Sequence, residues 1–217
     1  MGQAASLDDL RIQLAPAVAD AAAFDGWSEE AVRAAAQQHG VDPAAAIFAF
    51  SGGAMQMIDA WIASIDAAMV AALPKEQLAA LKIRERIRTL VQFRLDAIAG
   101  QKEALRRAQA IMAMPQNAPR SVQLGWRSAD AMWRQAGDTA SDYNHYTKRA
   151  TLGAIYAATL AVYAGDQSEG SADTRAFLER RIDGIMKFEK AKARWLNPER
   201  EHFSPARLLG RLRYPSR

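Results

Sequence analysis

The chain lacks residue types on which whole classes of protein depend. None of its 217 residues is cysteine, which excludes a disulfide framework, a thiolate metal site and a cysteine nucleophile. The three histidines, His39, His145 and His202, are widely separated, unlike the two Glu-x-x-His pairs of a di-iron bundle. The Ser and Thr residues show no nucleophile context. We therefore expect no metal site, no cofactor and no catalytic activity.

Long apolar runs and positively charged leaders are also missing. The most apolar stretch, residues 150–165, is shorter than the ~20 residues that a membrane-spanning helix needs. Residues 1–9 carry two acids and no base, unlike a signal or transit peptide. The net charge of +4 permits an anionic partner without requiring one. These features predict a soluble or peripheral protein.

Helix-forming residues dominate what is present. Half of the sequence is hydrophobic, alanine is abundant, and β-branched and aromatic residues are sparse. Pro, Gly and Asn divide the chain into segments whose apolar residues recur at helical spacing. The expected helices span residues 7–22, 28–39, 42–48, 54–73, 74–99, 102–114, 121–136, 142–165, 172–195 and 204–213. The sequence thus predicts an all-α fold with a head (1–53), a helical body (54–195) and a carboxyl-terminal segment (196–217).

Two short helices joined by a tight turn at Gly40 form a helix-turn-helix pattern in the head. With one helix before them and a longer bundle after them, they have the layout of a TetR-type repressor. The second helix of such a pair reads DNA and needs polar or basic side chains. Residues 41–50 hold Asp42 as their only charge. We expect a TetR-like bundle whose head binds no nucleic acid; the alternative is a transcriptional repressor with an apolar effector.

Residues 150–165 form the most informative segment because they contain no charged side chain. A helix that is apolar on every side lies in a core, in a membrane or around an apolar guest. Its small residues either let another backbone approach closely or leave room for a ligand. The segment is thus a central core helix or the wall of a cavity for an acyl or isoprenoid chain. The candidate lipid-binding residues are Leu90, Phe93, Ile98, Leu105, Ile111, Met132, Leu152, Ile155, Tyr156 and Leu160.

The carboxyl-terminal segment is basic and amphipathic, with no acid from residue 204 onward. Such a helix can lie in the membrane interface, where each arginine near an anionic surface contributes ~1 kcal/mol. The alternative is a tail that packs on its own bundle or is solvated. The candidate membrane-binding residues are Arg207, Leu208, Leu209, Arg211 and Leu212.

A series of short segments resembles one known family over nearly the whole chain, from about residue 24 onward. The segments are FDGWS at 24–28, FSGGA at 50–54, IDAW at 58–61, WRSADAMW at 126–133, AGD at 136–138, DYNHYTKR at 142–149 and RAFLERRI at 175–182. Their order resembles the lipid-binding accessory protein of coenzyme Q (ubiquinone) biosynthesis, the ninth Coq protein. Residues 126–160 are the most specific part of the resemblance.

The resemblance implies a TetR-like fold that has lost DNA binding and contains a hydrophobic cavity for isoprenoid quinone precursors. It also implies peripheral membrane attachment through the carboxyl-terminal helix. Members of this family dock on a di-iron hydroxylase of the same pathway and present it with demethoxy-quinone taken from the bilayer. The expected partners are therefore this hydroxylase and membrane lipids, and a homodimer is possible.

The resemblance further places the partner-binding surface at the start of the helix that begins near residue 142. The candidate residues are Asp142, Tyr143, His145, Tyr146 and Arg149. His145 departs from the aromatic pair found there in relatives. Mitochondrial members carry a transit peptide and this sequence shows none, so we expect a cytoplasmic protein on a bacterial inner membrane, or a processed one on the matrix side.

Overall fold

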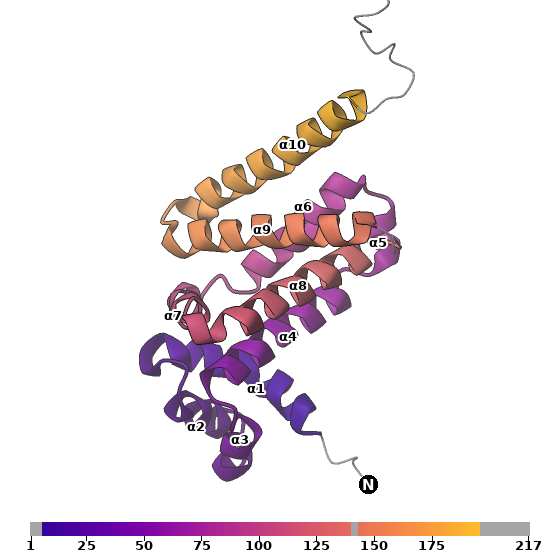
Figure 1. Cartoon of the computed structure of the whole chain (residues 1–217). Coiled ribbons are helices and arrows are strands. Elements are labelled where there is room, and N and C mark those ends of the chain that lie inside the picture. Colours follow the sequence, from indigo (N-terminus) through magenta and orange to yellow (C-terminus); the bar gives the residue numbers. More distant parts are fainter. Residues whose placement is uncertain (1–5, 140–142, 196–217) are drawn as a thin grey trace, which may run out of the picture. The chain divides into compact units, whose positions relative to one another are not determined.

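The computed structural model describes residues 6–139 and 143–195, and the described residues contain helices and no strand (Figure 1). The all-α prediction is confirmed. The helices are α1 (Leu7–Asp25), α2 (Glu29–Gln38), α3 (Pro43–Ala49), α4 (Ala54–Ala72), α5 (Lys75–Ala79), α6 (Ile83–Asp96), α7 (Lys102–Met112), α8 (Ala118–Gln135), α9 (Tyr143–Gly165) and α10 (Ala172–Trp195). Short 3₁₀ turns at Pro115–Asn117 and Glu169–Ser171 precede α8 and α10.

Side-chain caps fix where the three head helices begin. Ser6 and Asp9 form a reciprocal capping box at the start of α1. The Ser28 hydroxyl accepts from the Ala31 amide at 3.4 Å, and Asp42 accepts from the first-turn amides of α3. The caps that the sequence predicts at Ser28 and Asp42 are therefore present.

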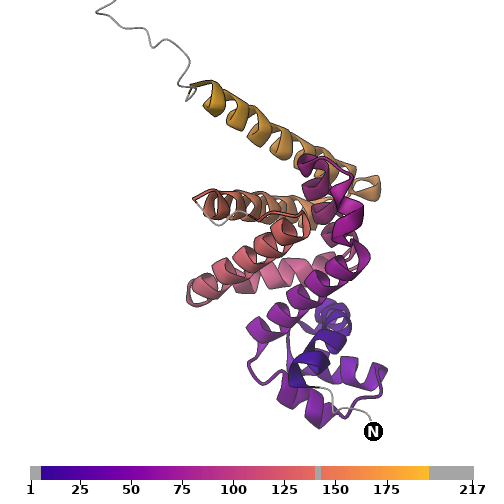
Figure 2. The same cartoon turned by 90° about the vertical axis from the view of Figure 1, so that its right-hand side faces the viewer.

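The head packs on the body through a pair of tryptophans. Helix α1 contacts α2, α3, α4 and α7, and Figures 1 and 2 show α1–α3 gathered at one end of the bundle. The Trp27 indole N–H donates to the Ala104 carbonyl at 3.1 Å, and its ring lies 5.3 Å from that of Trp61. The two predicted regions, head and body, thus share one compact unit that extends to Glu179.

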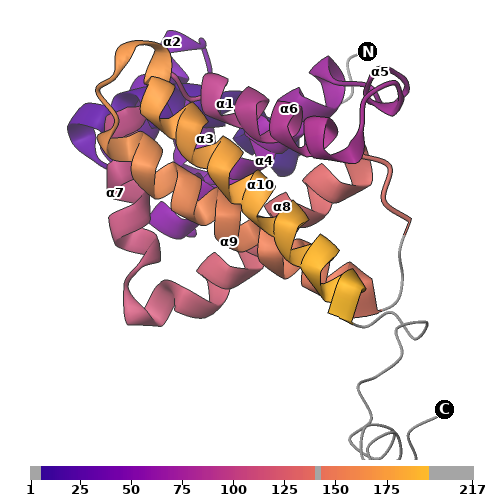
Figure 3. The ribbon, with the colours of Figure 1, turned by 90° about the horizontal axis from the view of Figure 1, so that it is seen from above.

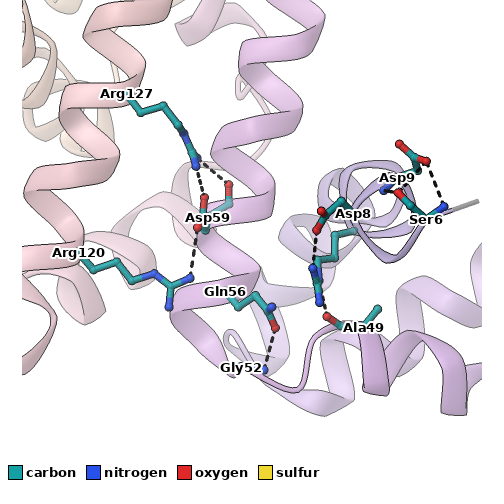
Figure 4. A network of polar contacts seen from close by, with 10 residues as sticks. Ser6, Asp8, Asp9, Ala49, Gly52, Gln56, Asp59, Arg120 and Arg127 are labelled. Carbon is teal, nitrogen blue, oxygen red and sulfur yellow. Dashed lines mark hydrogen bonds and ion pairs between the residues drawn. The ribbon is translucent and has the colours of Figure 1, made fainter.

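Polar contacts secure the joint between the head and α4 (Figure 4). Arg11 Nε donates to the Ala49 carbonyl at 2.5 Å, which ties α1 to the end of α3. The Gly52 amide donates to Gln56 Oε1 at 2.8 Å. Gly53 has φ +71°, a left-handed conformation that glycine adopts without strain, so the chain turns here into α4.

Helix α4 is the central helix of the body. Within the described part of the chain it is the one helix long and apolar enough to cross a membrane by length and composition. It nevertheless contacts α1, α6, α7 and α8, and it carries Asp59 and Asp66. Arg127 pairs with Asp59 at 2.6 Å and Arg120 at 3.2 Å, so α8 is clamped to α4 (Figure 4). Its apolarity therefore accords with a core position in the bundle.

The prediction of one helix over residues 74–99 is wrong, because the chain breaks between α5 and α6. Arg86 explains the break, since its guanidinium donates to the carbonyls of Ala79, Leu81 and Ala136, each at 2.8 Å. These bonds capture carbonyls that a continuous helix would use within its own backbone. The sequence shows the arginine but not the distant Ala136 that completes the arrangement.

The body is closed by α8 and α9, which lie side by side (Figures 1 and 3). Helix α9 also contacts α6 and α7. The first part of α10, up to Glu179, belongs to the same compact unit, and Arg88 pairs with Glu179 at 2.6 Å. Residues from Arg180 form a second unit, which is described only as the remaining turns of α10.

Asp166 organises the connection between α9 and α10. Its carboxylate accepts from the amide and hydroxyl of Ser168 at 2.8 and 2.6 Å, and from the amide and hydroxyl of Thr174 at 2.9 and 2.5 Å. The Lys102 ammonium donates to the Asp166 carbonyl at 2.5 Å. Hydrogen bonds from Ser168 and Thr174 hold the pKa of the Asp166 carboxyl well below its ordinary value, outweighing the opposing effect of burial.

We predict that Asp166→Asn lowers the free energy of unfolding at neutral pH by about 1–3 kcal/mol, the usual worth of bonds to a charged acceptor. Because the folded-state pKa is depressed, this stabilisation is present above the unfolded pKa of about 4 and is lost as pH falls further. Urea midpoints of both proteins should therefore converge below about pH 4. Glu169→Gln serves as the control; a gap for Asp166→Asn that is constant with pH would contradict the assignment.

Candidate ligand-binding cavity

A cavity of about 690 Å³ lies in the body between α4, α6, α7, α8 and α9. Its wall is mostly aliphatic and aromatic, with a few polar side chains. The lining residues are Ile58, Trp61, Ile62, Ile65, Arg94, Ile98, Leu105, Ala108, Gln109, Met112, Ala113, Ser121, Val122, Leu124, Gly125, Trp126, Ser128, Arg149, Ala150, Gly153, Ala154, Tyr156, Ala157 and Leu160. All of them belong to the compact unit that ends at Glu179.

Small residues on α8 and α9 create the space. A methyl group at Gly153 would lie 3.8 Å from Ala129 Cβ and from the Gly125 carbonyl, so the two helices approach closely there. A methyl group at Gly125 would meet no atom within 4 Å. Ala154 and Ala157 line the cavity and are nevertheless exposed. Side chains this short leave the wall of α9 open to solvent instead of filling it.

The mouth of the cavity is apolar and aromatic. Val122 lies in the wall and is 72% exposed, so the cavity opens to solvent along α8. Trp126 also lines it, and its ring lies 6.1 Å from that of Tyr146, which is 60% exposed. The His145 ring lies 5.2 Å from Tyr146. An aromatic cluster of Trp126, His145 and Tyr146 thus extends from the cavity to the surface.

A buried ion-pair network holds the start of α9 against the end of α8. Arg149 is 2% exposed, and its guanidinium pairs with Asp130 at 2.6 Å and with Asp138 at 3.1 Å. Lys148 pairs with Asp138 at 2.7 Å. Burial raises the pKa of the Asp138 carboxyl, but hydrogen bonds from Lys148 and Arg149 outweigh it and the pKa is lowered. Asp138 therefore stays ionised and pins the connection between the helices.

A second buried arginine lies across the cavity on α6. Arg94 is 1% exposed, donates to Asp66 on α4 and to the Ser128 hydroxyl at 3.1 Å, and its guanidinium lies 4.9 Å from the centre of the Tyr156 ring. The described residues contain no group of three or more His, Asp or Glu side chains arranged to hold a metal ion. The polar chemistry of the wall is thus that of two paired arginines and neighbouring hydroxyl and amide groups.

The structure divides the ten candidate lipid-binding residues into two groups. Ile98, Leu105, Tyr156 and Leu160 line the cavity. The other six do not: Leu90, Met132, Leu152 and Ile155 are buried in the surrounding core, Ile111 is half-buried, and Phe93 lines a separate hollow of about 410 Å³ beside Leu178. Helical spacing predicts which face is apolar, but not whether that face meets a hollow or a packed neighbour.

The candidate partner residues are also placed differently. His145 and Tyr146 lie in the aromatic cluster, whereas Arg149 is buried and offers no contact surface. Asp142 and the Tyr143 side chain, together with the candidate membrane residues Arg207, Leu208, Leu209, Arg211 and Leu212, lie outside the described residues.

Sequence reasoning missed the contribution of α4 and the buried arginines. Ile58, Trp61, Ile62 and Ile65 form an apolar stripe at helical spacing, which was a signal for one wall of the cavity. Arg94 had no such signal, because it lies in a run of basic residues on α6 that is typical of a solvated face.

The architecture is that of the TetR class: a three-helix head on a helical body that encloses a ligand-sized cavity. A solved structure of a TetR transcriptional regulator from Nitrosomonas europaea matches with a TM-score of 0.64 at 24% sequence identity, covering 82% of this chain and 98% of that one. At this identity the match establishes the fold alone. The predicted TetR-like fold is confirmed.

The sequence relatives define the family within that class. Residues 118–189, which include α8 and α9, match the family model described as COQ9. The chain carries a COQ9 domain, and the family resemblance read from its sequence is confirmed.

Curated relatives share the same name. The mitochondrial ubiquinone biosynthesis protein COQ9 of Rattus norvegicus is 36% identical over 168 residues, and its Homo sapiens counterpart is 34% identical over the same length. Each match covers 74% of this chain, and 54% and 52% of those two proteins. The chain thus spans about half the length of the curated relatives that it matches.

We predict that Arg149→Met lowers the free energy of unfolding by about 3–5 kcal/mol, because it leaves Asp130 and Asp138 without their buried partner. Arg134→Met is a matched control, since Arg134 pairs with the same Asp130 at 2.7 Å but is 70% exposed. Exposed pairs contribute about 0–1 kcal/mol. Urea unfolding followed by circular dichroism measures both; equal losses would show that the buried network does not hold the helices together.

Proposed function

We propose that this chain is a non-enzymatic, lipid-binding accessory protein of ubiquinone biosynthesis. It binds an isoprenoid quinone precursor in the cavity and presents it to a membrane-associated di-iron hydroxylase. The observation that carries the proposal is an open apolar cavity built partly from α8 and α9, the helices that match the COQ9 family. The name of the curated relatives supports the pathway.

The size and chemistry of the cavity suit a prenylated ring. Small-molecule sites typically enclose about 300–1,000 Å³ and combine apolar walls with few polar groups. The 690 Å³ cavity lies within that range. Removing apolar surface from water contributes about 25 cal/mol per Å², so a prenyl chain binds without a code of specific hydrogen bonds. The open mouth lets a longer tail extend beyond the protein.

The aromatic cluster at the mouth supports a presenting role. Exposed aromatic side chains are enriched among residues that dominate binding energy at interfaces. Tyr146 is such a residue, and it adjoins Trp126 in the cavity wall. A partner that docks on Tyr146 is therefore next to the opening through which the ligand leaves.

The head is proposed to have no role in DNA binding. The exposed side chains of α3 are Ala44, Ala45 and Phe48, none of which reads a base edge or neutralises a phosphate. The TetR fold alone favours a repressor with an apolar effector, and a salt-dependent DNA-binding assay separates the two functions.

We further propose that the protein acts at the membrane surface, on the inner membrane of a bacterium or the matrix side in a mitochondrion. The proposal rests on the basic amphipathic sequence of residues 204–217, which lies outside the described residues, and on relatives named as mitochondrial.

We predict that Ala154→Phe/Ala157→Phe weakens binding of a decyl-substituted benzoquinone about tenfold or more, because two benzyl groups fill space that the ligand needs. The quinone quenches tryptophan fluorescence, and Trp61 and Trp126 lie in the cavity wall, so quenching reports occupancy. Titration of detergent-free, delipidated protein gives the dissociation constant.

The control is Ala158→Phe/Ala161→Phe, which has the same chemistry and spacing on the same helix. Ala158 and Ala161 are exposed and do not line the cavity. It should bind the quinone like the unmodified chain. Equal affinity for all three proteins, or no binding by any of them, would refute the cavity as the binding site.

We also predict that Tyr146→Ala reduces affinity for the di-iron hydroxylase about tenfold or more, as expected for an exposed aromatic anchor. Phe48→Ala on the head is the matched control, because Phe48 is 66% exposed and distant in the fold. Surface plasmon resonance with immobilised hydroxylase measures both. A loss for Phe48→Ala alone would move the docking surface to the head.

A further inference from the structure

The cavity wall contains an arginine whose hydrogen-bonding capacity is only partly used. Arg94 donates from its two terminal nitrogens, to Asp66 and to the Ser128 hydroxyl at 3.1 Å. Its third group, Nε, is buried and has no hydrogen-bond partner in the described part of the chain. A buried donor without a partner is costly, typically about 1–3 kcal/mol, so Nε is suited to donate to a molecule that occupies the cavity.

The positive charge of this arginine is already compensated. Asp66 forms an ion pair with it, and the Tyr156 ring lies against the guanidinium at 4.9 Å. Burial opposes the charged form, but Tyr156 and Asp66 outweigh it and raise the pKa of Arg94. Arg127 also approaches Asp66, at 3.9 Å, but its side chain is 43% exposed and it pairs more closely with Asp59.

The second arginine in the wall is compensated in the same way. Arg149 pairs with Asp130 and Asp138 at 2.6 and 3.1 Å. Both buried cations that line the cavity are therefore neutralised by carboxylates of the protein. A lipid anion that enters would lose its hydration without gaining an unpaired cation, which is strongly unfavourable in an apolar site. An uncharged molecule incurs no such loss.

We propose that the Arg94–Asp66 pair makes the cavity selective for an uncharged apolar molecule bearing a hydrogen-bond acceptor, and excludes lipid anions. This inference rests on the proposed function and specifies the ligand class of the same cavity. Arg94 Nε donates to a carbonyl or ether oxygen of the bound ring, while Asp66 cancels the charge that would otherwise attract carboxylates and phosphates.

The test uses two competitors that differ only in their head group. Decyl-benzoquinone is bound to delipidated protein at about pH 8, where a fatty acid is ionised, and is displaced by tetradecan-1-ol or by tetradecanoate. In the unmodified chain tetradecanol should displace the quinone at about tenfold lower concentration than tetradecanoate. In Asp66→Asn, which leaves Arg94 charged and unpaired, tetradecanoate should improve about tenfold while tetradecanol is unchanged.

Asp59→Asn is the matched control. Asp59 lies seven residues before Asp66 on α4 and also pairs with arginines, but those arginines are 42% and 43% exposed. It should leave the alcohol-to-carboxylate ratio as in the unmodified chain. Equal displacement by both competitors in the unmodified chain, or an equal change in Asp59→Asn, overturns the inference while quinone binding still supports the proposed function. Absence of quinone binding overturns both.

A double variant keeps the test decisive if Asp66→Asn does not fold. Asp66→Asn/Arg94→Gln removes both charges and the Nε donor together. It should continue to reject tetradecanoate, because no unpaired cation is exposed, and should bind decyl-benzoquinone several-fold more weakly relative to tetradecanol. An unchanged quinone affinity, or improved binding of tetradecanoate, would contradict the role of Arg94. Circular dichroism and the urea midpoint report whether each variant is folded.

Discussion

The compensation of buried charge in the wall of the cavity is the constraint on which the body depends. A hollow between helices forgoes the packing contacts that normally fix their positions, so the walls must be held by other means. Here Arg94 joins α6 to Asp66 on α4, and Arg149 joins α9 to Asp130 on α8. Each pair places a cation in an apolar setting, and each requires its carboxylate because a lone buried charge is strongly destabilising.

Small residues and ion pairs thus have complementary roles. Glycine and alanine on α8 and α9 provide the space, and α8 and α9 still approach closely at Gly153. The clamp of Arg120 and Arg127 on Asp59 fixes the opposite side of α8 against α4. The wall therefore remains rigid where its side chains are too short to fill the interior, which favours a preformed site over one that collapses when empty.

Much of the fold could be predicted from the sequence because its signals are local. Caps at Ser28 and Asp42 and apolar spacing locate the helices and the TetR-like layout. The charge-free helix α9 correctly indicates where the cavity is found. The prediction is less accurate for individual lining residues: Leu152 and Ile155 share its apolar character but pack into core.

The rest depends on contacts between segments far apart in the chain. Nothing near Arg94 in sequence distinguishes it from the solvated arginines of α6, since its partner Asp66 lies 28 residues earlier. The break between α5 and α6 likewise depends on a bond from Arg86 to the carbonyl of Ala136, 50 residues away. Such residues become recognisable only once the fold has brought the helices together.

Native mass spectrometry of the full chain, purified without detergent, tests the central claim most directly. The account predicts a retained non-covalent adduct that fragments to an uncharged prenylated ring, one molecule per chain. Recovery of unliganded chain alone, or of phospholipid or fatty-acid anions in the cavity, would contradict it.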